Sequence, residues 1–156
     1  MNTEMNKHKN APDLTTCPPR SPRITLGGYA ILPRLLDKVR ADLAGVIGEY
    51  HTNCPIDKEF LTFVNIDYDE LRAQLKLGKG DGEILEWIEG NAGSPRSPWE
   101  IQHWSNYQNH RAPGSLTDME DYFRDTLGSL NRLRSDVKSW SDLLDLDDYC
   151  SFGGAA

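Results

Sequence analysis

The chain has 156 residues, of which 38% are apolar and 26% are charged, and its formal net charge is −7. This length suits one domain with a sizeable core, and the negative charge disfavours general binding to nucleic acids or to anionic membranes. The chain has no apolar run of about 20 residues, no apolar leader and three cysteines without a close pair, which predicts a soluble, cytoplasmic protein with reduced thiols.

The N-terminal part of the chain is polar and then rich in proline. Residues 1–11 have no apolar periodicity, so we expect a disordered tail. Prolines 12, 18, 19 and 22 follow, and their fixed φ angles predict an extended segment that lies over a formed core. The pair Gly27-Gly28 breaks the chain before the first long helix, expected at about 32–44. That helix has one apolar face, made of Leu32, Leu35, Leu36, Val39 and Leu43.

The rest of the chain reads as further short helices. We expect them at about 56–64, 68–77, 83–89, 97–111, 117–130 and 139–146. Capping boxes at Asp67, Ser97 and Thr117 mark three of the starts. Only 61–66 could compete as a strand. The sequence therefore predicts an all-α fold: a single compact domain over 12–152 with six to seven short helices, an extended Pro-rich N-terminal segment, and a frayed C-terminus over 153–156. The acidic stretch from Asp147 onward is also expected to fray.

The segment 45–63 concentrates reactive groups, with Glu49, Tyr50, His51 and Cys54 inside six positions. Pro55 suits the first position of a helix, so Cys54 is the expected N-cap, where the helix dipole favours a thiolate. His51 could then act as a base, and Glu49 or Asp57 could orient its ring. The alternative is a small buried cap residue beside a histidine that bonds to the backbone.

The polar side of the first helix offers a place for an anion. Arg34, Asp37 and Lys38, with Arg40 and Arg23 nearby, could form a pocket wall that faces residues 49–54, since arginine grips carboxylates and phosphates. Two alternatives stay open: a solvated face with weak surface pairs, or arginines that anchor the proline-rich segment and the acidic tail. The acidic run is correspondingly either solvated charge or a partner for Arg20, Arg23 and Arg34. Its members are Asp142, Asp145, Asp147 and Asp148.

Metal and cofactor sites have weaker signals. His51 and Cys54 could ligate zinc with Glu49, Cys17 or Cys150, but no second closely spaced ligand pair exists, so we predict no metal and no cofactor. The four tryptophans fall on helices with apolar neighbours, which favours core packing over stacking on nucleic-acid bases.

Four segments of the chain resemble successive blocks of one bacterial family. They read LGGYAILPRLLDKVRADLAG, GEYHTNCPIDKEFL, SPWEIQHWSNYQNHRAPG and DLDDYCSF. The family is known only as a domain of unknown function, number five thousand and sixty-nine in its series, and the resemblance covers roughly residues 13–152. It implies a small, soluble, single-domain bacterial protein and supplies no catalytic residue, cofactor or partner.

The residues favour one function and leave a second open. We expect a small anionic molecule to bind between Arg34, Asp37, Lys38 and the segment 49–54 with Asp57, with or without thiol chemistry at Cys54. The alternative is a non-catalytic interaction or structural module in which the same side chains only stabilise the fold. The first predicts that Arg34, His51 and Cys54 line one solvent-reachable cavity; the second predicts internal hydrogen bonds and no cavity. The oligomeric state is not determined by the sequence.

Overall fold

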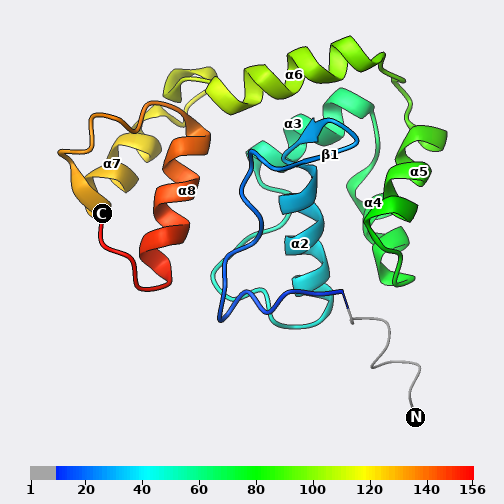
Figure 1. Cartoon of the computed structure of the whole chain (residues 1–156), viewed down its shortest axis with the longest axis horizontal. Helices are drawn as coiled ribbons and strands as arrows, with labels where there is room; N and C mark the ends of the chain where they lie inside the picture. Colours follow the sequence, from blue (N-terminus) through cyan, green and yellow to red (C-terminus); the bar gives the residue numbers. More distant parts are fainter. Residues whose placement is uncertain (1–9) are drawn as a thin grey trace.

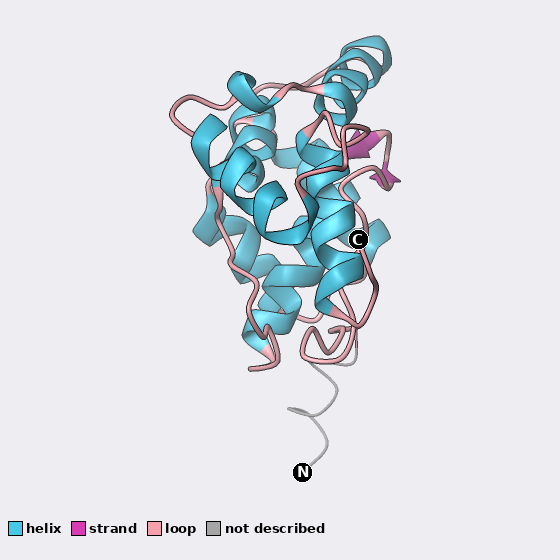
Figure 2. Ribbon diagram, turned by 90° about the vertical axis from the view of Figure 1, so that its left-hand side faces the viewer, coloured by secondary structure: helices cyan, strands magenta, loops and turns pink. Residues whose placement is uncertain are grey.

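The computed structural model describes residues 10–156, so most of the predicted tail lies outside the described residues. Seven α-helices account for most of this part, which confirms the all-α prediction (Figures 1 and 2). In chain order the elements are β1 Thr25–Leu26, β2 Tyr29–Ala30, α2 Leu32–Leu43, α3 Pro55–Val64, α4 Tyr68–Lys76, α5 Asp81–Asn91, α6 Pro98–His110, the 3-10 helix η1 Pro113–Ser115, α7 Glu120–Asn131 and α8 Trp140–Ser151. None of the helices described is long and apolar enough to cross a bilayer.

Three local expectations were wrong. A short hairpin was not expected, in which Thr25 pairs with Ala30 and Leu26 with Tyr29. The helix expected from Thr117 begins instead at Glu120, because Asp118 has a left-handed φ of 61° and the capping box cannot form. The last helix does not fray after residue 146 but continues to Ser151.

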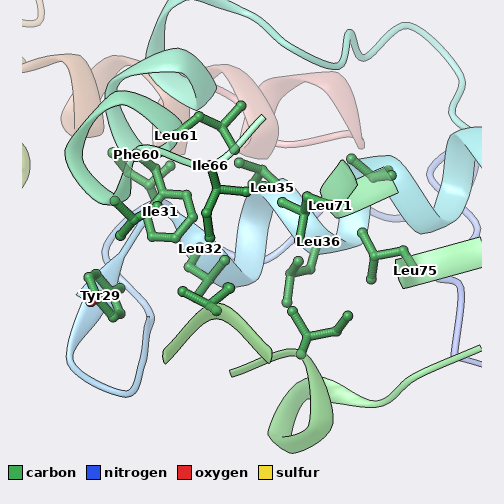
Figure 3. Close-up of a cluster of buried hydrophobic side chains, with 14 of the residues drawn as sticks. Tyr29, Ile31, Leu32, Leu35, Leu36, Phe60, Leu61, Ile66, Leu71 and Leu75 are labelled. Atoms are coloured by element: carbon green, nitrogen blue, oxygen red, sulfur yellow. The ribbon is translucent and has the colours of Figure 1, made fainter. Parts of the chain in front are cut away.

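Helix α2 lies at the centre of the larger of two apolar clusters. Its residues Leu32, Leu35, Leu36 and Val39 are fully buried against Phe60 and other side chains of α3, α4 and α5 (Figure 3). A smaller cluster holds α7 and α8 together around Phe123, Trp140 and Leu143. Helix α6 spans both groups across the top of the molecule and contacts β2 and α8 (Figure 1). Ile56 packs against both clusters, so the start of α3 lies where they meet.

The charged side chains of α2 are buried, so the interpretation of a solvated face was wrong. Arg34, Asp37, Lys38 and Arg40 are each at most 7% exposed. Every one has an ion-pair partner. Their partners come from the proline-rich segment, α3, α5 and α8, so α2 is enclosed on its polar side as well as on its apolar side. Since a buried charge without a partner is very costly, these pairs fix which segments surround the helix.

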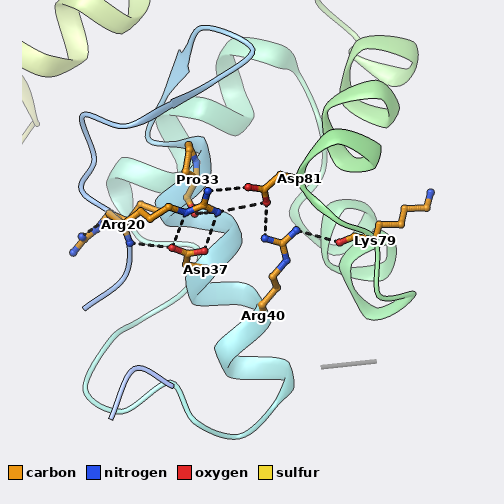
Figure 4. A network of polar contacts seen from close by, with 7 residues as sticks. Arg20, Pro33, Asp37, Arg40, Lys79 and Asp81 are labelled. Atoms are coloured by element: carbon orange, nitrogen blue, oxygen red, sulfur yellow. Dashed lines mark hydrogen bonds and ion pairs between the residues drawn. The ribbon is translucent and has the colours of Figure 1, made fainter. Parts of the chain in front are cut away.

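One of these networks ties the proline-rich segment to α2 and α5 (Figure 4). Arg20 donates from Nε to Asp37 over 3.0 Å and from Nη1 to Asp81 over 2.8 Å, and its backbone N–H also donates to Asp37. Arg40 donates to Asp81 over 2.6 Å. Burial acts to raise the pKa of Asp81, but the two arginines outweigh it and hold that pKa below its ordinary value. The network thus anchors the extended N-terminal segment that the prolines predicted.

Candidate functional site

A pocket of about 480 Å³ lies where α2, the segment 48–57 and the end of α8 meet. Its floor includes Gly48, which has a left-handed φ of 61°. A Cβ at this position would lie 2.8 Å from the carbonyl oxygen of Leu14, so only glycine fits the close approach of these two segments. The lining residues with polar side chains are Thr15, Arg34, Lys38, Glu49, Tyr50, His51, Cys54, Asp57, Tyr122, Asp147 and Ser151.

The pocket brings together seven of the eight side chains predicted for the site. Residues from α2, from the segment 49–54 and from α3 all line it, namely Arg34, Lys38, Glu49, Tyr50, His51, Cys54 and Asp57. Asp37 lies apart from them, where it binds Arg20. The first expectation is met, because Arg34, His51 and Cys54 line one pocket. The second is met only in part, because Arg34 is hydrogen-bonded internally but a cavity is present.

Arg34 is held by the last helix. Its Nη1 and Nη2 donate to the two carboxylate oxygens of Asp148 over 2.7 and 3.2 Å, and Nη1 also donates to the carbonyl oxygen of Arg20. The Tyr50 hydroxyl donates to Asp148 over 2.8 Å, and its ring lies beneath the guanidinium, 5.6 Å from Cζ. Burial, and then the bond to Asp148, raise the pKa of Tyr50 well above its usual value. Of this cluster, Arg34 and Tyr50 line the pocket.

Lys38, which also lines the pocket, contacts both the carboxylate of Asp57 and the thiol of Cys54. Its Nζ donates to Oδ2 of Asp57 over 2.9 Å and to Sγ of Cys54 over 3.4 Å. As predicted, Cys54 is the N-cap of α3 and Pro55 occupies the first turn, but the sulfur accepts no backbone N–H. Asp57 is 1% exposed, and its Oδ1 has no hydrogen-bond partner within residues 10–156.

The predicted pairing of His51 with Cys54 is not made in this arrangement. His51 and Glu49 are exposed at the pocket mouth, and neither side chain has a hydrogen bond or ion pair to another described residue. The group that contacts the thiol is the ammonium of Lys38. The polar contact of the Cys54 sulfur therefore comes from α2 and not from the histidine.

The end of α8 supplies the part of the pocket that the sequence analysis did not assign. Leu144, Asp147, Ser151 and Phe152 complete the wall, together with Tyr122 of α7. The acidic run was the sequence feature that pointed to this part of the pocket. As one of the alternatives predicted, Asp148 forms an ion pair with Arg34, and Asp142 and Asp145 form ion pairs with Arg23. Arg20 does not pair with this run. Burial, and then the charge of Asp148, raise the pKa of Asp147.

Other places on the molecule offer less. A larger hollow of about 880 Å³ lies between the hairpin and α6 and contains none of the predicted residues. The Ser105 hydroxyl on its wall is already used, since it donates to the Gly28 carbonyl and accepts from the Ala30 N–H. No group of three or more His, Cys, Asp or Glu residues in the described chain is arranged to hold a metal ion.

Comparison with known protein families matches residues 16–150 to the family described as Domain of unknown function (DUF5069). The chain belongs to this family. The match confirms the resemblance inferred from the sequence, and it includes both Arg34 and Asp148, which form a buried ion pair. No curated protein matches the chain.

Proposed function

We propose that the pocket binds a small molecule through an anionic group of that molecule. The observation that carries the proposal is the set of N–H donors that Arg34 and Lys38 leave unused at the pocket wall. Lys38 has three ammonium protons and two partners. Arg34 has five donors and uses three, so its Nε–H and one Nη2–H have no acceptor in the described part of the chain.

The start of α3 adds further donors to the same wall. The first backbone N–H groups of a helix have no intrahelical partner and carry partial positive charge. The side chain of Cys54 leaves them uncapped, and Ile56 and Asp57, in this first turn, line the pocket. An anionic group placed beside Lys38 would therefore meet backbone and side-chain donors together.

The surrounding charge indicates how such a ligand is held. Arg34 and Lys38 are each neutralised by an aspartate, and Glu49 and Asp147 add negative charge at the wall. Long-range attraction therefore contributes little, and binding depends on directed hydrogen bonds. Affinity should consequently respond more to the geometry of the ligand than to salt.

Thiol chemistry at Cys54 is a second candidate, favoured by the contact between its sulfur and Lys38. The test compares Cys54 with Cys17, which is exposed and serves as an internal control. Iodoacetamide should alkylate Cys54 faster than Cys17 at pH 7 although Cys54 is less exposed. Slower alkylation of Cys54 than of Cys17 removes this candidate.

The rival function, a non-catalytic interaction or structural module, draws on the same ion pairs, because they already stabilise the fold without a ligand. A thermal-shift screen of carboxylates and phosphates separates the two, since a ligand of the native state raises Tm. His51→Ala is the informative variant: this side chain lines the pocket and makes no internal hydrogen bond, so its loss should spare the fold. His103→Ala, at the other hollow, is the control.

A hit that His51→Ala weakens and His103→Ala does not would support the pocket. No hit among carboxylates and phosphates, or hits that His103→Ala weakens and His51→Ala does not, would favour the module.

A further inference from the structure

The pocket wall contains more carboxylates than cations. Arg34 and Lys38 each have an aspartate as partner. Glu49 and Asp147 also line the pocket, and within residues 10–156 neither forms an ion pair. A purely anionic ligand would add to this excess of negative charge, whereas a ligand that also carries a cation would reduce the repulsion.

Asp57 adds an acceptor that the fold does not satisfy. The residue is 1% exposed, Oδ2 accepts from Lys38, and Oδ1 has no donor among the described residues. Buried carboxylate oxygens in native proteins nearly always accept a hydrogen bond. Because Asp57 lines the pocket, a ligand there can supply the missing donor.

We infer that the ligand of this pocket is a zwitterion of the amino-acid type, whose ammonium group binds Asp57 and Asp147 and whose carboxylate binds Arg34 and Lys38. The inference rests on the proposed function, which supplies the anionic half of the ligand. An ammonium offers three donors, enough for Oδ1 of Asp57 and a second carboxylate. A bare metal ion fits less well, since no group of three or more His, Cys, Asp or Glu residues in the described chain could hold one.

The position of Asp147 supports this assignment. Its carboxylate lies beside Asp148, has no cation of its own, and has a pKa raised by burial and by that neighbour. The ionised Asp147 carboxylate lowers the stability of the free protein, and the ammonium group of a ligand would offset this cost by pairing with it. Asp145 lies on the same helix but pairs with Arg23 outside the pocket, so it provides a control with the same change of charge.

The test uses the twenty standard L-amino acids, each compared with the acid that lacks its amino group, by thermal shift and then by titration calorimetry. The best amino acid should bind at least about tenfold more tightly than its deaminated counterpart, as expected for hydrogen bonds to charged groups. Asp147→Asn should lower the affinity for that amino acid about tenfold. It should not lower the affinity for the deaminated acid, because it removes a negative charge from the pocket wall. Asp145→Asn should change neither.

Two results would overturn the inference in distinguishable ways. If deaminated acids bind as well as amino acids, or if Asp147→Asn has no effect on amino-acid binding, the zwitterion is wrong and the proposed anion site stands. If no amino acid or plain carboxylic acid binds but a phosphate does, the zwitterion is wrong and the anion site stands; if none of the three classes binds, both proposals fail. Asp147→Asn is preferred to Asp57→Asn, because the latter leaves Lys38 buried without its counterion and risks unfolding the protein.

Discussion

Asp148 should be a principal contributor to stability, because it is the only ion-pair partner of Arg34 among the described residues and links α8 to α2. In Asp148→Asn the shape of the side chain is kept and its charge is lost. The side chains of Arg34 and Asp148 are only 5% and 10% exposed, so the arginine cannot recover water as a substitute. Breaking a buried pair of this kind costs about 3–5 kcal/mol.

The same helix provides a matched control. Asp145 pairs with Arg23, whose side chain is 37% exposed and also binds Asp142. Exposed pairs contribute about 0–1 kcal/mol, so Asp145→Asn should change stability little. The two variants differ in burial and not in chemistry.

Urea unfolding followed by circular dichroism measures the difference. With an m value of about 2 kcal/mol/M, a loss of about 3 kcal/mol moves the midpoint of Asp148→Asn down by about 1.5 M. The midpoint of Asp145→Asn should move by less than about 0.5 M. Equal shifts for the two variants, or a shift below about 0.5 M for Asp148→Asn, would refute the view that buried ion pairs hold α8 against α2.

Three further predictions concern the segments around the pocket and the pH dependence of stability. Gly48→Ala should lower the free energy of unfolding by at least about 2 kcal/mol, because the strain of a left-handed φ adds to the close contact with Leu14. Gly45 also has a left-handed φ but has open space around it, so Gly45→Ala should cost only about 1 kcal/mol. Equal unfolding midpoints in urea for the two variants would contradict this. Asp81 has a lowered pKa, so its contribution to the free energy of unfolding is present above its unfolded pKa of about 3.9 and is lost as the pH falls through its lower folded pKa. Asp81→Asn should therefore be less stable than the original protein at pH 7, and should lose less stability than that protein between about pH 4 and 2. Asp147 has a raised pKa, so its ionised form lowers the free energy of unfolding. Asp147→Asn should therefore raise that free energy at pH 7 and leave it unchanged near pH 3. A loss of stability at pH 7 would show that the carboxylate has an internal partner.

Local signals in the sequence were sufficient for several helix starts. Ser97 and Glu100 form the predicted capping box, with the Ser97 N–H donating to Glu100 over 2.7 Å. The hairpin also had a signal that was not used: Gly27 and Gly28 both have positive φ, as the tight turn between two strands requires. The helix start predicted at Thr117 was wrong because the backbone at Asp118 is left-handed, which the sequence pattern does not show.

The site could be predicted only where its residues are close in sequence. Segment 49–54 and the N-cap at Cys54 followed from composition and from Pro55. The pair Arg34–Asp148 joins residues 114 positions apart, so only the fold decides between a solvated and a buried arginine. For the same reason Lys38, and not His51, proved to be the neighbour of the thiol.

The most direct test of the proposed site is a crystal structure grown with the tightest acid or amino acid from the screens. We expect electron density in the pocket at the end of α8, with an acidic group about 2.7–3.0 Å from Nζ of Lys38 or from the free donors of Arg34. Density for the ligand in the hollow between the hairpin and α6, with the pocket beside Lys38 occupied only by water, would contradict it.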